Sequence, residues 1–451
     1  MGCREGGKGL SGAGSAGGRG GQAVYDWGIH PMHFLLTPVG SSGDVHPYVG
    51  IGAVLRARGH QATLLAAEPH RPVAERAGLE FGALNSAEEY HAATLDPDLW
   101  HPRRGLAKVM TLVASGLEAG WRQLEAHYRP GRTILVGHPL AFVTRSFEEK
   151  TGAPAATLHL APSSLRTAYR VPAFPPHVDI SGWPLPLKRA FWAVVDRLSV
   201  DPLIVPALNR FRAERGLAPV RRVFKEWINS PNRTIGLFPE WFGPRQPDWP
   251  DRFGYASFPL WDDPGGAAID VELERFLAAG SPPVVVTPGS ANRHAESFFA
   301  AAATALGRLG RRGLFLTGFP EQLPPDLPAA ILHRPYAPFS AVLPRSAALI
   351  HHGGIGTLAQ GMAAGVPQLI MPMGFDQPDN ALRAKELGIA RWVLPGRFTA
   401  DRVTRSLGEL LDSPATAGAV AECRDRIRGE NGIGRACDLL EEVGNAAKVA
   451  R

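Results

Sequence analysis

Short apolar runs alternate with longer amphipathic stretches along most of this chain. From residue 32, the run MHFLLTPV is followed by the turn GSSGD, by a stretch of helical periodicity that ends at Gly59, and by the run HQATLLAA. The runs RTILVGHP and PAATLHLAP continue the series. Such alternation is typical of parallel sheets with helices on both faces, in which ligands bind at the loops that follow the strands. The pattern therefore predicts an α/β fold.

The pattern stops and then starts again, which indicates two domains. Residues 163–249 are rich in Pro and Trp, and the end of this stretch is typical of a stiff, extended connection. Strand-like and helix-like runs resume with PPVVVTPGS and continue to PQLIMPM. We predict α/β domains at residues 32–250 and 281–425, with a cleft between them. Residues 251–280 are the predicted linker, and residues 426–451 are predicted to form C-terminal helices.

The ends of the chain and its cysteines bear on where the protein works. The first 31 residues are Gly-rich and contain no continuous apolar segment, so we predict a disordered tail rather than a signal peptide. No apolar run reaches the length of a membrane span. The three cysteines, Cys3, Cys423 and Cys437, have neither the spacing of a metal site nor an even-numbered disulfide framework. We therefore expect a cytoplasmic protein in a reducing setting.

Charge narrows the classes of partner. The chain of 451 residues carries a formal net charge of +6, but no dense block of Lys and Arg is present. This distribution argues against nucleic acid as a partner, and it fits either a solvated basic face or an anionic small substrate.

The most unusual residues lie in HHGGIGTLAQGMAAG, where a predicted strand turns into a helix. The first N–H groups of a helix have no intrahelical partner, and the helix dipole favours an anion there. Gly353, Gly354 and Gly356 would let a phosphate approach the backbone closely. Thr357 adds a hydroxyl and His352 adds an imidazole N–H. These residues predict a pyrophosphate-binding turn.

Two classes of enzyme could use such a turn: oxidoreductases that bind a dinucleotide, and enzymes that bind a nucleotide attached to a sugar. Gly354, Gly356 and Ala359 match the dinucleotide fingerprint. Asp376 lies twenty residues beyond Gly356, where a ribose-binding acid is expected, so an NAD(P)-dependent oxidoreductase is one hypothesis. Against it, Asp376 follows a loop instead of closing a strand, and it precedes Gln377, which suits sugar hydroxyls. A purely structural role of the glycines in helix–strand packing is the third hypothesis.

The stretch HHGGIGTLAQGMAAGVPQLIMPMGFDQPDNALRAKELGIA resembles the donor-binding signature of family 1 glycosyltransferases, which have the GT-B fold. Other segments extend the resemblance: GSSGDVHP resembles the Gly-rich N-terminal loop, TPGS the phosphate-side loop of the second domain, and YAPFSAVLPRSAALIHHGG the base-binding segment. LDPDLW, NSPNRTIGLFPEWFGPRQPDWP and SFPLWDD resemble the rhamnosyltransferase B chain subgroup of rhamnolipid synthesis, which moves L-rhamnose from dTDP-rhamnose to a hydroxyacyl lipid. The resemblance implies two Rossmann-like domains facing across a cleft, with the terminal helices crossing back to the first.

The resemblance also implies roles for residues of the second domain. The donor diphosphate would be held by Ser290, His352, Gly354, Gly356 and Thr357. The donor sugar would be bound by Asp376, Gln377 and Asn380, and the nucleobase by Tyr336 and Ala337. Helix N-capping is an alternative role for Ser290 and for Asn380. Two further alternatives for Asn380 are support of the loop that carries Asp376 and Gln377, and contact with phosphate.

Two side chains in GSSGDVHP are candidates for the general base that takes the proton of the acceptor hydroxyl. The resemblance favours Asp44, with His46 second. Asp44 has an alternative role as the N-cap of the following helix, and His46 as part of the wall of the site. A single displacement by the acceptor would invert the anomeric carbon.

The acceptor is expected to be lipophilic, because aromatic residues are frequent in the middle of the first domain. The aromatic residues expected to form an acceptor channel are Phe174, Trp183, Phe191 and Trp192, and packing in the hydrophobic core is the alternative role of each. We therefore predict transfer of a hexose of the rhamnose or glucose type from a UDP- or dTDP-sugar to a lipophilic hydroxyl. Peripheral contact with the inner face of a membrane would fit such an acceptor. A catalytically silent subunit that needs a partner chain is a third class of function.

We expect no metal and no cofactor. Asp96 and Asp98, and the pair Asp262 and Asp263, resemble a metal-binding DxD pair only superficially, because both lie in Pro-containing loops that favour turns. The helix dipole and His352 can offset the charge of the leaving diphosphate instead.

Overall fold

The computed structural model describes residues 31–101, 103–173, 180–263 and 269–449, without the side chains of residues 448 and 449. Met32–Arg451 form one compact unit. The tail predicted for residues 1–31 lies outside the described residues, apart from Pro31. None of the described helices is long and apolar enough to cross a membrane.

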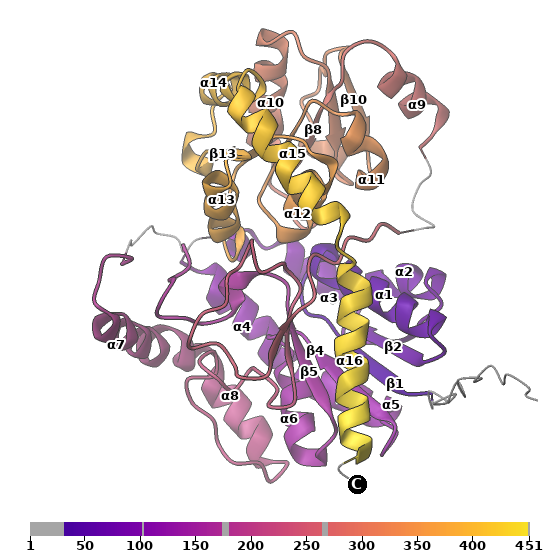
Figure 1. Ribbon diagram of the computed structural model, residues 1–451, viewed down its shortest axis with the longest axis vertical. Helices are drawn as coiled ribbons and strands as arrows, with labels where there is room; N and C mark the ends of the chain where they lie inside the picture. The colour runs from indigo at the N-terminus through magenta and orange to yellow at the C-terminus, as the bar shows by residue number, and fades with distance from the viewer. Residues whose placement is uncertain (1–30, 102, 174–179, 264–268, 450–451) are drawn as a thin grey trace, which may run out of the picture. The chain divides into compact units, whose positions relative to one another are not determined.

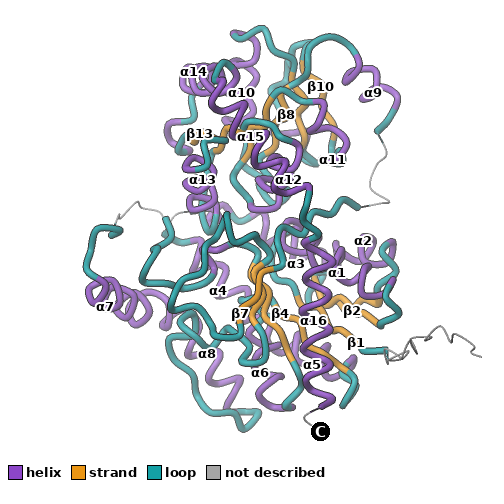
Figure 2. Tube along the Cα trace, in the orientation of Figure 1, coloured by secondary structure: helices purple, strands orange, loops and turns teal. Residues whose placement is uncertain are grey.

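Two parallel sheets form, the first from strands up to Tyr255 and the second from strands that start at Val284, which confirms the predicted α/β class (Figure 1, Figure 2). Among the described residues the first sheet has seven strands in the order β3-β2-β1-β4-β5-β6-β7. Their bounds are β1 His33–Thr37, β2 Gln61–Ala66, β3 Glu80–Ala83, β4 Thr133–Gly137, β5 Ala155–His159, β6 Thr234–Gly236 and β7 Phe253–Tyr255. The second sheet has six described strands in the order β10-β9-β8-β11-β12-β13. Their bounds are β8 Val284–Thr287, β9 Gly313–Leu316, β10 Ile331–Arg334, β11 Ala348–His351, β12 Gln368–Ile370 and β13 Ala390–Trp392.

Helices connect the strands of both sheets. Those of the first part are α1 Ser42–Ala57, α2 Arg71–Arg76, α3 Ala87–Leu95, α4 Gly105–Ser115, α5 Leu117–His127, α6 Phe142–Thr151, α7 Leu185–Val195 and α8 Asp201–Ala213. Those of the second part are α9 Val271–Ala278, α10 Glu296–Arg308, α11 Phe339–Val342, α12 Ile355–Ala364, α13 Gln377–Glu386, α14 Ala400–Leu411, α15 Pro414–Arg428 and α16 Gly432–Val449. Short helical turns are η1 Glu68–His70, η2 Pro97–Trp100, η3 Pro162–Ser164, η4 Asp196–Val200, η5 Pro320–Gln322, η6 Leu343–Arg345 and η7 Pro395–Arg397.

Alternate side chains of β1 enter two different cores. Phe34 and Leu36 face a core to which α1 and α16 contribute, whereas Leu35 faces a core built with α5, α6 and α8. All three side chains are fully buried. Neighbouring residues of a strand point to opposite faces, so a strand covered on both sides needs an uninterrupted apolar run. This is why β1 has a continuous hydrophobic sequence.

The last helix, α16, lies against the first sheet (Figure 1). Arg58, the C-cap of α1, pairs with Asp438 at 2.8 Å and with Glu441 at 2.9 Å. A methyl group at Gly444 would lie 2.2 Å from Sδ of Met32, so the missing side chain lets α16 approach the start of β1. The chain therefore leaves the second sheet and ends on the first.

The stretch predicted as an interdomain linker contains regular structure at both ends. Its first part forms β7, the edge strand of the first sheet, and its last part forms α9, which packs on the second sheet. The ring of Phe253 in β7 lies 5.0 Å from that of Trp249 and 6.3 Å from that of Phe238. Aromatic residues interpreted as part of a stiff connection thus belong to the core of the first sheet, because their burial outweighs the cost of ordering the chain.

Candidate functional site

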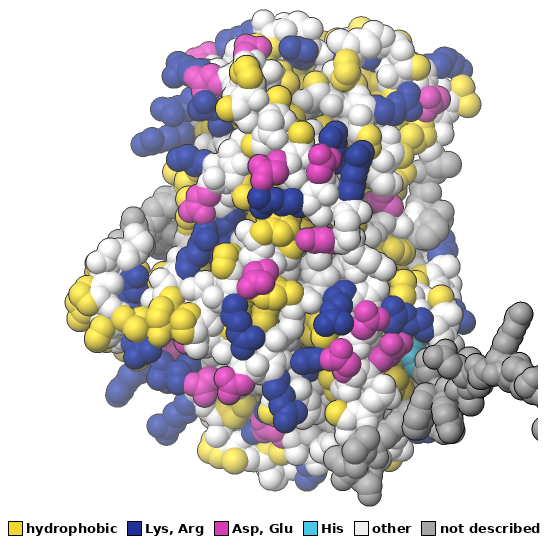
Figure 3. All heavy atoms as spheres, viewed as in Figure 1, with side chains coloured by type: hydrophobic (Ala, Val, Ile, Leu, Met, Phe, Trp, Pro, Cys, Tyr) yellow, Lys and Arg dark blue, Asp and Glu magenta, His cyan; other side chains and the backbone are white. Residues whose placement is uncertain are grey.

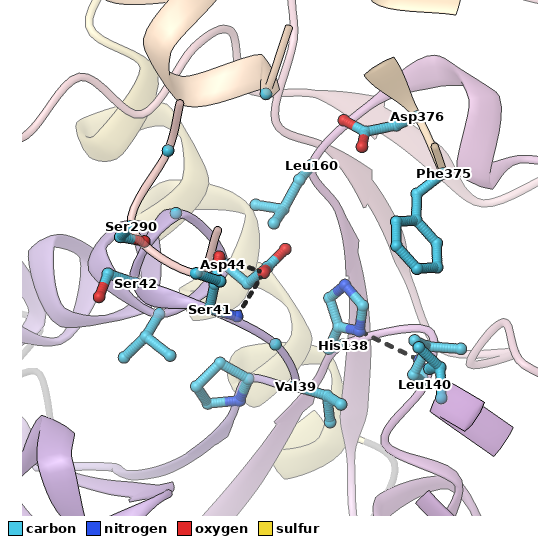
Figure 4. A pocket seen from close by; sticks show the side chains of 18 of the residues that line it. Val39, Ser41, Ser42, Asp44, His138, Leu140, Leu160, Ser290, Phe375 and Asp376 are labelled. Carbon is cyan, nitrogen blue, oxygen red and sulfur yellow. Dashed lines mark hydrogen bonds between the residues drawn. The ribbon is translucent and has the colours of Figure 1, made fainter. Parts of the chain in front are cut away.

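A cavity of about 1720 Å³ is lined by loops from both sheets. Its wall includes the segments that follow β1, β4 and β5 of the first sheet and β8, β11 and β12 of the second. The carboxyl ends of parallel strands are where open α/β sheets bind ligands. Figure 4 shows part of this wall, with Asp44 and His138 on one side and Asp376 and Phe375 on the other.

Asp44 lies in the first turn of α1 and borders the cavity. Its Oδ2 accepts hydrogen bonds from the Ser41 N–H at 2.7 Å and from the Ser41 hydroxyl at 3.2 Å, and its other oxygen points into the open space (Figure 4). Gly40 has φ +137°, and a methyl group there would lie 2.1 Å from Oδ2. Burial, and then the charge of Asp376, raise the pKa of Asp44 to about 7. Ser41 is the N-cap of α1, so Asp44 is not the N-cap itself but completes a capping box from the third helical position. A raised pKa is the property that a general base at neutral pH requires.

His46 also lines the cavity, two residues further along α1. Its ring packs edge-on against Trp261, with 5.5 Å between the ring centres. Burial lowers the pKa of His46, although the charges of Asp263 and Asp262 oppose this shift. Burial thus disfavours the charged form of His46, which forms part of the wall.

The Gly-rich turn joins β11 to α12, as predicted. Gly353 has φ +95°, in the left-handed region that favours glycine, and Gly354 is the N-cap of α12. The cavity is lined by Gly354, Gly356 and Thr357 at the start of this helix. The structure thus brings a helix N-terminus to the cavity wall, where its unpaired N–H groups and dipole favour an anion.

His352 is held in a narrow slot beside this turn. A methyl group at Gly289 would lie 2.7 Å from its ring, and one at Gly354 would lie 2.6 Å from its Nε2. Burial lowers the pKa of His352 to about 4, so its ring is neutral. Its Nδ1 is buried and has no hydrogen-bond partner among the described residues. A buried polar atom without a partner at a cavity wall fits a ligand that supplies one.

Asp376 and Gln377 lie in the loop after β12, at the start of α13, and both line the cavity. Gln377 Oε1 accepts from the N–H groups of Met373 at 2.8 Å and Gly374 at 3.3 Å, which leaves its amide nitrogen for a ligand. Burial raises the pKa of Asp376 to about 6. The pair offers an acceptor and a donor side by side, as sugar hydroxyls require.

Asn380 does not line the cavity, so it has the predicted alternative role of supporting the donor loop and not a place beside the sugar. It is fully buried inside α13, and its amide donates to Gly353 O at 3.0 Å and to Asp376 Oδ2 at 2.7 Å. The alternative N-cap role is also wrong, because α13 begins at Gln377. The sequence pattern placed Asn380 near the sugar because it is three residues from Gln377, but a helix turn points it towards the loop it supports.

The remaining predicted donor residues all line the cavity, from three different segments. Ser290 follows β8, and Tyr336 and Ala337 follow β10. Ser290 is not an N-cap, because α10 begins only at Glu296. Tyr336 is 37% exposed, so its ring face is open to a stacking partner.

The predicted acceptor channel is formed in part. Phe191 and Trp192 line the cavity, whereas Trp183 is 44% exposed and does not. Phe174 lies outside the described residues. Trp183 belongs instead to an exposed apolar patch on and near α7, which Figure 3 shows on the left. Side chains of α4 complete the apolar wall, and they are Val109, Met110, Leu112 and Val113.

The carboxylate pairs considered as metal ligands have other partners. Asp96 Oδ1 accepts from the Asp98 N–H at 2.9 Å, which closes a turn, and Asp98 pairs with Arg104 at 2.8 Å. Asp262 Oδ2 accepts from the Ser340 N–H at 2.9 Å. Arg76 pairs with Asp263. Turns and contacts between segments account for these residues.

Phe375 was missed by sequence reasoning. It has φ +58°, in a region that side chains with a Cβ rarely adopt, and its ring lies 5.8 Å from that of Trp100. Backbone strain of this kind is found at ligand sites, where the surrounding structure maintains it. A single apolar residue in a loop is not part of a periodic pattern, so no sequence signal indicated that Phe375 borders the cavity.

The position of Asp376 does not favour the oxidoreductase hypothesis. A ribose-binding acid closes the second strand of the dinucleotide motif, whereas Asp376 lies six residues beyond the end of β12, at Ile370. Its carboxylate instead contacts Asn380, which holds it beside the Gly-rich turn.

Comparisons with known proteins agree with this geometry. Residues 320–431 match the family model described as "Erythromycin biosynthesis protein CIII-like, C-terminal domain". O-mycaminosyltylonolide 6-deoxyallosyltransferase of Streptomyces fradiae is 32% identical over 444 residues, which covers 91% of this chain and 97% of that protein.

Two solved structures share the fold at lower identity. The glycotransferase of kitacinnamycin superposes with a TM-score of 0.71 at 22% identity, covering 92% of this chain and 99% of that one. Spinosyn rhamnosyltransferase SpnG complexed with thymidine diphosphate has a TM-score of 0.61 at 16% identity, covering 89% and 98%. Since a glycosyltransferase of 32% identity matches nearly its whole length and its solved neighbours are GT-B enzymes, this chain belongs to the glycosyltransferase family, as an enzyme with the GT-B fold.

Proposed function

We propose that this enzyme is an inverting, metal-independent hexosyltransferase that moves a 6-deoxyhexose from a thymidine diphosphate sugar to a hydroxyl of a lipophilic acceptor. One observation carries the proposal. Asp44 of the first domain and the residues around His352 and Asp376 of the second line the same cavity, so a base and a donor site face one reaction centre.

The donor diphosphate would lie against the N-terminus of α12. The backbone N–H groups of Gly356 and Thr357 and the Thr357 hydroxyl are donors there, and neutral His352 has one ring N–H to give. Ser290 would reach the same group from the loop after β8. As the bond to the sugar breaks, these donors would stabilise the charge that develops on the leaving diphosphate.

The transferred sugar would lie between Asp376, Gln377 and Asp44. Asp376 accepts hydrogen bonds from its hydroxyls, and the free amide of Gln377 donates one. The acceptor oxygen attacks the anomeric carbon from the face opposite the diphosphate. The new glycosidic bond forms, the carbon–oxygen bond to the diphosphate breaks, and the hydroxyl proton passes to Asp44. One displacement of this kind inverts the anomeric carbon.

The identity of the sugar is supported by two resemblances. The relative of 32% identity is named for transfer of a 6-deoxyallosyl group, and the rhamnolipid subgroup transfers rhamnose, which is also a 6-deoxyhexose. A solved neighbour is a rhamnosyltransferase complexed with thymidine diphosphate. The relative of 32% identity is named for O-mycaminosyltylonolide, whereas the subgroup that the sequence segments resemble uses a hydroxyacyl lipid as acceptor. Both acceptors are lipophilic and suit a wall built from α4 and from Phe191 and Trp192.

A donor screen followed by a transfer assay tests the proposal. Purified protein is first heated with a panel of dTDP- and UDP-sugars, because a bound donor raises the melting temperature by mass action. The best donor is then incubated with O-mycaminosyltylonolide and with methyl 3-hydroxydecanoate, and products are identified by mass spectrometry and NMR. A product with the opposite anomeric configuration to the donor is expected. Binding of NAD(P)H with turnover, or a need for a second chain, would refute the proposal in favour of the two alternative classes.

A further inference from the structure

His138 follows β4 directly and borders the cavity near Asp44. Its backbone is fixed on both sides: its N–H donates to Thr37 O at 3.0 Å, and its carbonyl accepts from the Ala141 N–H at 2.8 Å. The side chain is half-buried, and its ring stands at the edge of the open space that Asp376 and Phe375 face from the other side (Figure 4). The ring therefore has a defined place in the wall.

The tautomer of this ring follows from one contact. Nδ1 of His138 accepts a hydrogen bond from the Leu140 N–H at 3.2 Å, so the lone pair of this nitrogen is occupied. Burial, and then the neighbouring His159, lower the pKa of His138 to about 3, so the ring is neutral in the working range of the enzyme. In a neutral imidazole whose Nδ1 accepts, the proton is on Nε2. His138 thus has no free lone pair, which excludes it as the base, and it has one N–H to donate.

His159, at the end of the adjacent strand β5, shows the contrast. Its Nδ1 lies 2.8 Å from the Ser164 hydroxyl and its Nε2 lies 2.8 Å from Asn229 Oδ1, so both ring nitrogens have protein partners. Nε2 of His138 has no hydrogen-bond partner among the described residues, and it points into the cavity (Figure 4). The two hydrogen bonds of His159 are those of a structural residue, whereas His138 keeps one ring N–H without a partner in the described part of the chain.

The surroundings of this N–H are largely apolar. Leu140, Leu160 and Val39 flank the ring in the cavity wall (Figure 4). Arg166, which also lines the cavity, is paired with Asp196 at 2.7 Å. A donor flanked by apolar side chains helps to fix the orientation of a bound molecule, since an acceptor placed elsewhere leaves the N–H unpaired.

We propose that His138 selects and orients the acceptor: its Nε2–H donates a hydrogen bond to a carbonyl, ether or hydroxyl oxygen that lies beside the hydroxyl to be glycosylated. This inference rests on the proposed function and deepens it. It assigns the acceptor class as a lipophilic alcohol with a neighbouring oxygen, held so that its free hydroxyl faces Asp44. His138 would bind the acceptor and leave donor binding and proton transfer to other residues.

A matched pair of acceptors tests this assignment. Methyl 3-hydroxydecanoate has an ester oxygen near its hydroxyl, and decan-3-ol lacks it. With the wild-type enzyme we expect kcat/KM to be about 10 to 100-fold higher for the ester, as is common when a site donor is left unpaired by the poorer substrate. His138→Phe keeps the ring shape without the N–H and should lose this preference through a higher KM for the ester. His138→Gln keeps a donor and should restore part of it.

Two controls separate a binding role from a structural one. Affinity for dTDP should be unchanged in His138→Phe, because binding of the nucleotide does not involve the acceptor. His159→Gln should lower the melting temperature and leave the acceptor preference as it is. A His138→Phe variant that transfers with the wild-type preference overturns the inference, while the proposed function stands.

The tautomer can be measured without any acceptor. In ¹⁵N-histidine NMR of the wild-type protein, the resonances missing from His138→Gln should show an Nε2-protonated ring that does not titrate between about pH 5 and pH 9. A ring protonated at Nδ1, or one that titrates in this range, overturns the inference. If the protein binds no nucleotide sugar and transfers to neither probe nor to O-mycaminosyltylonolide, the proposed function has failed, and the NMR result still decides the state of His138.

Discussion

At the scale of single residues, the two oxygens of the Asp44 carboxyl have different surroundings. Oδ2 accepts from the Ser41 N–H and closes the first turn of α1, while the other oxygen faces the cavity (Figure 4). The hydrogen bonds from Ser41 favour the charged form, but burial and the charge of Asp376 outweigh them and raise the pKa. A capping role and a catalytic role are thus compatible in one residue.

Replacing Asp44 separates these roles. In Asp44→Asn the amide oxygen can still accept from Ser41, but it cannot take a proton. We expect kcat for transfer to fall by about 10² to 10⁴-fold, the usual contribution of a general base, with the Kd for dTDP unchanged. His46→Gln is the matched control and should retain most of the activity. Steady-state kinetics and calorimetric titration measure both quantities, and the opposite ranking of the two variants would make His46 the base.

The same substitution should stabilise the fold at neutral pH. Burial raises the pKa of Asp44 to about 7 and that of Asp376 to about 6, both above the ordinary value of 3.8. Between about pH 4 and pH 7 the folded state therefore binds more protons than the unfolded state, so its stability decreases as pH rises. The melting temperature of Asp44→Asn should exceed that of the wild type at about pH 7.5 and equal it near pH 4. Equal melting temperatures at both pH values would contradict the raised pKa.

At the scale of elements, the first residue of α16 packs closely against the backbone of the segment that contains Phe258. A methyl group at Gly432 would lie 2.1 Å from the backbone oxygen of Phe258, which cannot move aside as a flexible side chain could. Gly418, in α15, would meet nothing within 4 Å. The two glycines therefore differ in packing although both are helical.

Alanine at each position should have opposite effects. Gly432→Ala should lower the free energy of unfolding by about 1 to 3 kcal/mol, because the backbone contact has no room for a methyl group. Gly418→Ala should raise it by about 0.5 to 1 kcal/mol, since glycine costs entropy in a helix. Urea denaturation measures both. Equal stability of the two variants would mean that α16 is not in close contact with Phe258.

At the scale of the whole molecule, a buried ion pair ties the second domain to the first. In α13, Arg383 Nε lies 2.6 Å from Asp379 Oδ2, and the two side chains are 5% and 2% exposed. Arg383 also donates to Phe242 O at 2.9 Å, and Asp379 Oδ1 accepts from the Ala173 N–H at 3.3 Å. Both of these partners belong to loops of the first domain, so α13 carries the donor loop and an interdomain contact together.

Breaking this pair should be costly. Arg383→Met leaves Asp379 buried without its charge partner, and we expect a loss of about 3 to 5 kcal/mol of unfolding free energy. Removing both charges in Arg383→Met with Asp379→Leu should recover much of the loss, because desolvation of the ions then disappears. Arg426→Met, which breaks an exposed pair with Glu422 in α15, should cost no more than about 1 kcal/mol. If Arg383→Met and Arg426→Met lost similar amounts of unfolding free energy, the pair of Arg383 and Asp379 would not be a buried ion pair.

The two domains together should make a metal unnecessary. The α12 N-terminus, His352 and Ser290 can offset the charge of the diphosphate from both sides. We expect initial rates to be unchanged after dialysis against EDTA, with no gain on addition of Mg²⁺ or Mn²⁺. Activity that is lost in chelator and restored by either ion would contradict this expectation.

Local sequence was sufficient for elements with a clear apolar pattern and for the donor turn. Apolar runs buried on two sides, such as β1, and a Gly-rich turn before a helix, such as His352 to Thr357, depend on neighbours in sequence, so pattern and spacing reveal them. Resemblance to a family then pointed to Asp376, Gln377 and Asp44, all of which line the cavity. Each of these residues lies in a short motif that can be recognised without the rest of the chain.

Tertiary structure alone decided what depends on packing between distant segments. It turned Asn380 away from the sugar and towards Gly353, and it buried Phe253 in a sheet where the sequence predicted a linker. It also placed the Leu140 N–H against Nδ1 of His138, so that Nε2 faces the cavity. The physical reason is that side-chain direction, burial and pKa are set by the sum of contacts around a residue, and most of those contacts come from parts of the chain that are far away in sequence.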